Sequence, residues 1–229
     1  MLICHRHRFI FLKTQKTAGT AIEIALRSLM DRGDVITPIS REDEHLSRQL
    51  GCPGPHNFRA PLHHYRGPDL ARLVGRARLK KRFYNHIPAA QVKAQLPESI
   101  WNSYLKISVE RNPFDKAISS YYWRTRKLKQ APPISEYLRS CPRSELSSWD
   151  IYTINDILVT EVMLRYETLV ADLQQLAQRL ALEGGLTLPA QRPKGQHRRD
   201  SRPWQEALDA ASQERIRTIC AREIEAFHY

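Results

Sequence analysis

The apolar positions along the chain change their period several times, and each change marks a predicted element. Residues 9–12, Phe-Ile-Phe-Leu, form a short aromatic and β-branched run that is typical of a buried strand. After a polar turn, the apolar residues of 22–29 recur at the spacing of one helix face. This pattern predicts a helix over 21–31, which Gly33 ends. The chain therefore opens with a strand, a turn and a helix.

The same order of strand, turn and helix returns twice. Residues 104–109 have the character of a strand and lead into an aromatic helix at 114–123. Residues 162–166 predict a third strand, and the leucines of 169–180 mark one face of the helix after it. A last apolar stripe at helical spacing covers 216–227. Alternating strands and helices predict an α/β fold with one largely parallel sheet and helices on both of its faces.

Two segments interrupt this pattern and are expected to be loops. Residues 37–82 are rich in proline, glycine and histidine, with one short helix predicted at 42–50. Loops of such length in compact domains are usually functional or mobile. Residues 189–203 are basic, bounded by prolines and without periodicity.

The length and the net charge of the chain limit the kinds of protein that it can be. With 229 residues and 41% apolar content, the chain is expected to form a single domain over 1–229. The formal net charge of +12 favours an anionic partner, which could be a nucleotide, an acidic glycan or a nucleic acid. The charge is spread over clusters at 76–82, 124–129 and 192–202, so a solvated basic surface is an equally good reading of it.

The cysteines and the first residues indicate the compartment. Cys4, Cys52, Cys141 and Cys220 lie far apart and contain no C-x-x-C pair, so neither a zinc site nor a disulfide framework is predicted. A reducing, cytoplasmic setting fits this usage best. The apolar stretch near the start is too short and too interrupted by charge for a signal peptide or membrane span, which favours a soluble protein.

The first candidate site is the turn in F-L-K-T-Q-K-T-A-G-T, residues 11–20. A strand-to-helix turn points backbone N–H groups and the positive end of a helix dipole at the space above it, which suits an anion. Lys16 adds a mobile charge, Thr17 and Thr20 add hydroxyls, and Gly19 permits close approach. The turn predicts phosphate binding although the full G-x-x-x-x-G-K-[ST] pattern is missing; a capped helix start is the plainer alternative.

The second candidate is S-V-E-R-N-P-F-D-K-A-I-S-S-Y-Y-W, residues 108–123. Arg111 follows the predicted strand, Pro113 forces a turn, and Ser119 lies about two helical turns further on. A guanidinium is a planar fork suited to phosphate, and a serine hydroxyl can complete such a site. Taken alone, an arginine at a strand end is more often a surface ion-pair partner.

Together, the two segments resemble the 3′-phosphoadenosine-5′-phosphosulfate (PAPS)-dependent sulfotransferases, especially the carbohydrate and related bacterial branch. The likeness rests on the lysine-bearing turn and on R-N-P-F-D-K-A-I-S-S-Y, and extends to R-Y-E-T-L at 165–169 and the closing E-I-E-A-F-H-Y. It is weak over 31–82. Gln15 replaces the proline that commonly precedes the lysine in the family.

The resemblance implies a three-layer α/β/α fold of the P-loop type, with PAPS bound at the carboxyl ends of the central strands, PAP as product and no metal. It implies that the phosphosulfate end contacts Lys16, Thr17, Ala18, Gly19, Thr20 and Ala21. It implies that Arg111 and Ser119 hold the 3′-phosphate, with Tyr166 at the nucleotide. The basic loop P-K-G-Q-H-R-R-D brings Lys194 and Arg198 as further nucleotide contacts, although these could equally be solvated charges.

Transfer to a hydroxyl needs a general base. His86, just before a helix expected to start near Pro88, is the first candidate, because the carbohydrate branch carries a histidine in this interval. We expect its imidazole to titrate near its ordinary pKa. A neutral histidine packed at the turn is the alternative reading, and His63, His64 and Glu23 are the other candidates. Adjacent His63 and His64 do not predict a metal site.

The predicted activity is transfer of a sulfuryl group to a hydroxyl or amine of a carbohydrate or related polar metabolite, with residues 38–82 on the acceptor side. Two alternatives remain open. An ATP-dependent kinase would use a related strand-turn-helix, but the Walker A pattern is incomplete and no strand visibly ends in a metal-binding aspartate. A basic nucleic-acid-binding protein would fit the charge, but no recognised binding motif is present.

Overall fold

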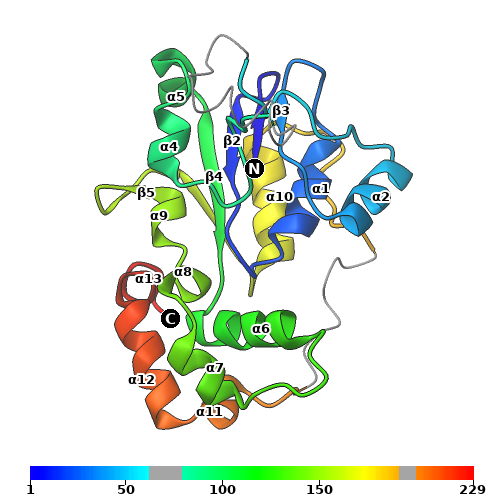
Figure 1. The fold of residues 1–229 in the computed structure, drawn as a ribbon. Helices are drawn as coiled ribbons and strands as arrows, with labels where there is room; N and C mark the ends of the chain where they lie inside the picture. The colour runs from blue at the N-terminus through cyan, green and yellow to red at the C-terminus, as the bar shows by residue number, and fades with distance from the viewer. Residues whose placement is uncertain (62–78, 191–199) are drawn as a thin grey trace.

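The computed structural model describes residues 1–61, 79–190 and 200–229, and its centre is a five-stranded sheet (Figure 1). Strands β2, β4 and β7 are parallel, whereas β1 is antiparallel to both of its neighbours. All strands of this sheet except β1 therefore share one direction. In spatial order the strands are β3 (Val35–Ile36), β1 (Leu2–Cys4), β2 (Phe9–Leu12), β4 (Leu105–Glu110) and β7 (Val162–Arg165).

Helices cover both faces of this sheet. Phe9 and Phe11 of β2 point to the face where they pack with α1 (Gly19–Arg27) and α10 (Leu169–Arg179). Ile10 and Leu12 point to the other face, because successive side chains of a strand alternate. The helices on this second face are α4 (Ala89–Lys93), α5 (Glu98–Ser103) and α9 (Trp149–Tyr152). The predicted mixed α/β architecture with a mostly parallel sheet is confirmed.

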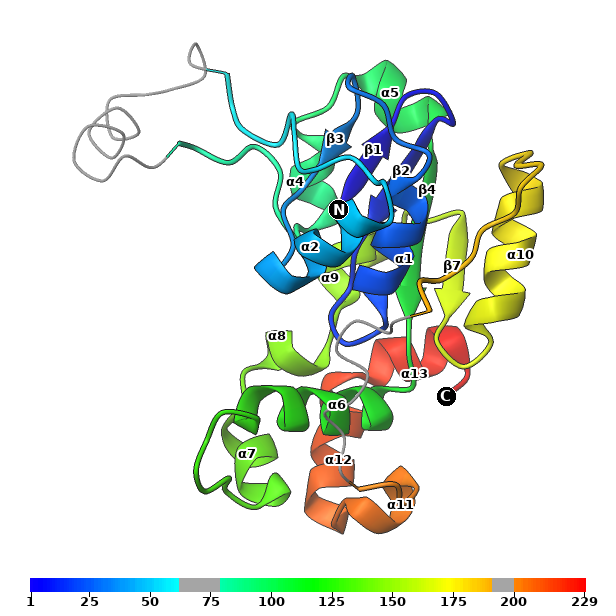
Figure 2. The same ribbon diagram turned by 90° about the vertical axis from the view of Figure 1, so that its right-hand side faces the viewer.

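A separate group of helices packs beyond the carboxyl end of β4 (Figure 2). Its core contains Phe114 and Ile118 together with Leu138, Leu146 and Ile216. The group consists of α6 (Pro113–Thr125), α7 (Ile134–Ser140), α8 (Arg143–Leu146), α11 (Trp204–Ala207) and α12 (Ala210–Ile219). This group of helices lies opposite the carboxyl ends of the parallel strands.

Several elements differ from the sequence-based prediction. Strand β1 was not predicted; it pairs with β2 through a tight turn in which Arg8 has a φ of 51°. The stripe at 216–227 is two helices rather than one, since α12 ends at Ile219 and α13 (Ala221–Phe227) begins after Cys220, which caps both. A small hairpin of β5 (Thr153–Ile154) and β6 (Ile157–Leu158) was also missed.

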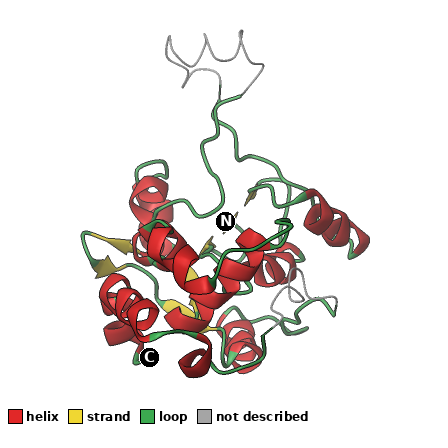
Figure 3. Ribbon diagram, turned by 60° about the horizontal axis from the view of Figure 1, so that its bottom comes forward, coloured by secondary structure: helices red, strands yellow, loops and turns green. Residues whose placement is uncertain are grey.

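The loop-rich interval contains the expected short helix, α2 (Arg41–Gln49), capped by the Ser40 side chain. Figure 3 shows helices and loops surrounding the strands. Within the described part of the chain, no helix combines the length and apolar character needed to cross a bilayer.

Candidate functional site

A cavity of about 940 Å³ lies at the carboxyl ends of the three parallel strands. The residue that directly follows each strand lines it: Lys13 after β2, Arg111 after β4 and Tyr166 after β7. Strands that run in the same direction bring their carboxyl ends to one edge, where open α/β sheets bind ligands. Residues far apart in the sequence therefore meet in one cavity.

The turn between β2 and α1 is held in a fixed, compact shape. Lys16 and Ala18 both have left-handed backbone conformations, with φ of 60° and 59°. The Thr14 hydroxyl donates to the Val109 carbonyl at 2.5 Å and lies 2.7 Å from the Thr17 hydroxyl oxygen. These contacts fix the turn to β4 before any ligand arrives.

Gly19 is needed at the start of α1 for a steric reason. A Cβ at this position would lie 3.0 Å from Cγ of Lys13 and 3.3 Å from the Thr14 carbonyl oxygen. Any larger residue would push the turn away from β2 or displace Lys13. Thr20 and Ala21 follow in the first turn of α1 and also line the cavity.

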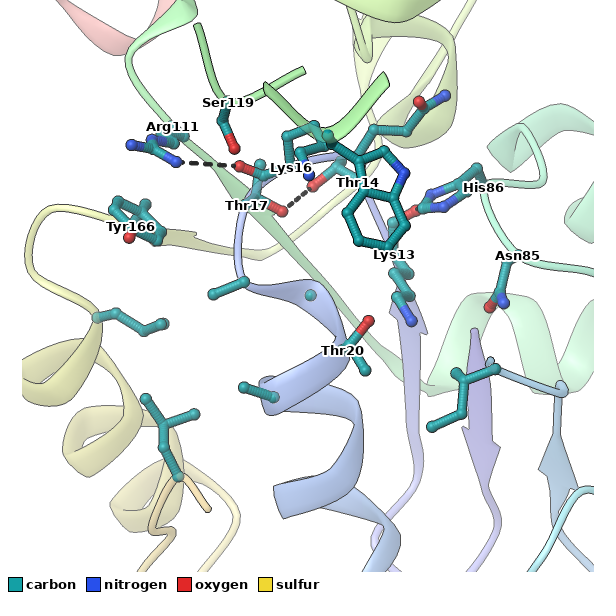
Figure 4. Close-up of a pocket in the computed structure, with 18 of the residues that line it drawn as sticks. Lys13, Thr14, Lys16, Thr17, Thr20, Asn85, His86, Arg111, Ser119 and Tyr166 are labelled. Carbon is teal, nitrogen blue, oxygen red and sulfur yellow. Dashed lines mark hydrogen bonds between the residues drawn. The ribbon is translucent and has the colours of Figure 1, made fainter. Parts of the chain in front are cut away.

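Two cationic side chains lie at the site, Lys16 from the turn itself and Arg111 from the end of β4 (Figure 4). The Arg111 guanidinium lies 4.0 Å from the Tyr166 ring centroid, and its Nη1 is 3.5 Å from the Lys16 carbonyl oxygen. The Lys16 ammonium lies 4.7 Å from the Trp123 ring centroid. Ser119, on α6, lines the same wall. The two segments singled out from the sequence therefore contribute to one site.

Lys13 was not recognised from the sequence, although its position directly after the strand was a usable signal. Its ammonium lies 2.7 Å from Oε2 of Glu23, whose other oxygen lies 3.0 Å from Arg27. Burial by itself would raise the pKa of Glu23, but the charges of Lys13, the Met1 ammonium and Arg27 outweigh it and hold the pKa at about 2. Glu23 is a fully buried ion-pair partner and does not line the cavity, which removes it as a candidate base.

His86 lies in the cavity wall with a defined tautomer. Its Nδ1 is 3.0 Å from the Lys13 carbonyl oxygen. A carbonyl only accepts, so Nδ1 carries the proton and Nε2 keeps its lone pair. Burial, followed by the charge of Lys13, lowers the pKa of His86 to about 4. This corrects the expectation of an ordinary pKa: the imidazole is neutral throughout the physiological range.

The remaining candidates from the sequence either line the cavity or lie outside the described residues. Lys194, Arg198, His63 and His64 lie outside the described residues. All the other predicted nucleotide contacts line the cavity, as does His86. Lining residues to which the sequence gave no individual role include Lys13, Thr14, Ile39, Ser40, Asn85, Trp123, Arg124, Glu145, Val170, Ala171, Leu188 and Pro189.

The two ends of the cavity differ in chemistry. One end, beside Tyr166, is mainly apolar: Leu169, Val170, Leu188 and Pro189 line it together with Glu167 and Thr168. The other end carries Ser40, Asn85 and His86, and Figure 4 places Asn85 and His86 on the side of Lys16 opposite Tyr166. Lys16 and Arg111 therefore lie between a mainly apolar end and a polar end whose charged residue, Lys13, is paired with Glu23.

Among residues 1–61, 79–190 and 200–229, no group of three or more His, Cys, Asp or Glu side chains is arranged to hold a metal ion. The four cysteines are buried and free.

Comparisons of the chain with protein-family models, with curated proteins and with solved structures gave no match. The functional argument therefore rests on the cavity itself.

Proposed function

We propose that this protein is a PAPS-dependent sulfotransferase that transfers a sulfuryl group to a hydroxyl or amine of a polar acceptor. The observation that carries the proposal is the meeting of the Lys16 turn, Arg111 and Ser119 in one cavity at the ends of adjacent parallel strands. Either segment alone has an ordinary structural explanation. Their convergence gives a site for a ligand with two separate anionic groups.

The cavity has the size and polarity that the donor needs. Ligand pockets span about 300–1,000 Å³, so about 940 Å³ accommodates a nucleotide together with an acceptor group. In this arrangement the purine occupies the apolar end beside Tyr166 and the 3′-phosphate binds Arg111 and Ser119. The phosphosulfate lies over residues 16–21, whose helix N-terminus and N–H groups favour an anion.

The transfer step follows from this placement. The acceptor oxygen attacks sulfur, the bond from sulfur to the bridging oxygen breaks, and PAP leaves with that oxygen. Lys16 stabilises the charge that develops on the bridging oxygen. The acceptor proton passes to Nε2 of His86, which is free to accept it because Nδ1 donates to Lys13.

The acceptor end supports a neutral, polar acceptor. Its described wall offers the amide of Asn85 and the hydroxyl of Ser40, and its charged residue, Lys13, is paired with Glu23. Hydroxyl groups of a carbohydrate or a similar metabolite match these donors and acceptors. The cationic side chains of Lys16 and Arg111 therefore serve the donor rather than the acceptor.

A thermal-shift panel tests the proposal against its rivals. PAP at 100 times its Kd should stabilise the fold by about 2.7 kcal/mol, which corresponds to roughly 5–10 °C in Tm for a domain of this size. Stabilisation by ATP with Mg²⁺ but not by PAP would favour a kinase. A response to an oligonucleotide alone would favour a nucleic-acid-binding protein.

The acceptor is then identified with labelled PAPS and a panel of saccharides, alcohols and amines, read by mass spectrometry. A labelled product that requires the wild-type protein supports the proposal. PAP binding without transfer to any class of acceptor would contradict the transferase assignment.

A further inference from the structure

The contact between Lys16 and Trp123 connects the two segments of the site. Trp123 lies on α6, one turn after Ser119, and its ring centroid is 4.7 Å from the Lys16 ammonium. The Cζ atom of Arg126 lies 3.5 Å from the same centroid. The ring therefore contacts one cation inside the cavity and one from the adjoining surface turn.

The helix that carries Trp123 is firmly anchored. The Asn112 side chain caps it, accepting from the N–H groups of Phe114 and Asp115. Lys116, in the second turn, forms a buried ion pair of 2.8 Å with Glu110 at the end of β4. The indole is thus presented by a rigid element fixed to the strand that also positions Arg111.

We propose that Trp123 is a positioning residue for Lys16: the indole face holds the ammonium between the phosphosulfate turn and His86, where charge develops during transfer. This inference rests on the proposed function. It assigns to Trp123 a role in the rate of the chemical step rather than in donor affinity.

The physical reason lies in the lysine side chain. Lys16 has a flexible four-carbon stem, so its ammonium needs a partner to define its position. A carboxylate partner would cancel the charge, as Glu23 does for Lys13 at 2.7 Å. An aromatic face attracts the cation through its quadrupole without neutralising it, and such a contact shifts an equilibrium by about two- to thirty-fold.

The expected kinetic result is a split between kcat and KM. Replacing Trp123 by leucine removes the aromatic face, and kcat for PAPS cleavage should fall about tenfold, while KM for PAPS changes by less than about twofold. Trp123→Phe keeps a smaller aromatic face and should restore part of kcat. Arg126→Gln, the matched control, removes the other cation from the same ring and should leave both parameters unchanged.

The closing experiment measures the contact and the kinetics separately. In the ligand-free protein, the ε-methylene protons of Lys16, assigned with Lys16→Met, should be shifted upfield by the indole ring current in the wild type and in Arg126→Gln, but not in Trp123→Leu. An unshifted wild-type resonance would overturn the proposal whatever the activity.

PAPS cleavage is then followed as PAP release, with the acceptor found in the screen or with water as acceptor, and folding is checked by Tm. A shifted Lys16 resonance in the wild type together with a normal kcat in Trp123→Leu would also overturn the positioning role. Failure of wild-type protein to bind PAP is a separate outcome, which refutes the proposed function and this inference with it.

Discussion

Replacing Arg111 by alanine tests the assignment of the 3′-phosphate to the end of β4. The guanidinium is half-buried, lies 4.0 Å from the Tyr166 ring centroid and reaches the Lys16 carbonyl oxygen, so its fork is oriented toward the cavity. Hydrogen bonds to charged groups contribute about 1.5–3 kcal/mol each, and partial exposure reduces the sum. We therefore expect loss of the guanidinium to cost about 3 kcal/mol of binding free energy, which corresponds to about a 150-fold increase in the Kd of PAP.

The assay is calorimetric titration with two ligands that differ in one group. Adenosine 5′-phosphosulfate lacks the 3′-phosphate, and its affinity should change by less than about threefold in Arg111→Ala, since the other contacts persist. Arg111→Lys keeps the charge without the fork and should give an intermediate loss for PAP. Tyr166→Leu removes the ring beside the guanidinium and should weaken PAP by about two- to fivefold.

Equal losses for PAP and adenosine 5′-phosphosulfate would refute the assignment. A large fall in the Tm of Arg111→Ala would show instead that the arginine stabilises the turn through the Lys16 carbonyl. The affinities of Arg111→Lys for PAP and for adenosine 5′-phosphosulfate then distinguish 3′-phosphate binding from stabilisation of the turn, because a structural role predicts equal losses for both ligands.

Three further results are expected. His86→Gln should slow transfer by about 10²- to 10⁴-fold without weakening PAP binding. Burial and the charge of Lys13 lower the pKa of His86 from 6.5 to about 4, so the wild type should lose stability relative to this variant as pH falls through that interval, by at most about 3 kcal/mol in urea titrations. Gly19→Ala should destabilise the fold by about 1–3 kcal/mol and weaken PAP, because its Cβ meets Lys13; an unchanged Tm would contradict the steric argument. Glu23→Gln removes the carboxylate paired with the buried Lys13, whereas Arg27 keeps Glu44, and should cost about 3 kcal/mol in free energy of unfolding. A loss below 1 kcal/mol would contradict that ion-pair network.

The sequence predicted an element correctly where the pattern of that element's own residues was sufficient to identify it. The run at 9–12 is β2, and the leucine stripe after residue 168 is α10, because each needs only its own alternation or helical period. The turn of Lys16 and the arginine after β4 were also found, since a strand end followed by a helix start defines both positions. The general α/β architecture followed from the alternation of these units.

Other features depend on partners that are distant in the sequence, and only the tertiary structure decided them. Strand β1 has three residues, too few for periodicity, and its antiparallel direction is set by pairing with β2 and β3. The helical stripe at the end of the chain is broken at Cys220: Ile216 of α12 packs in the core of the helix group, whereas Phe227 of α13 packs against the sheet.

The chemistry of the site divides in the same way. The sequence determined which residue types stand at the strand ends: a lysine turn, an arginine, a tyrosine and a histidine before a helix. The tertiary structure decided their states. It buried Glu23 against Lys13, placed the Lys13 carbonyl at Nδ1 of His86, and set Trp123 beside Lys16. Burial and long-range contact set a group's charge and position, and neither is encoded in the spacing of residues along the chain.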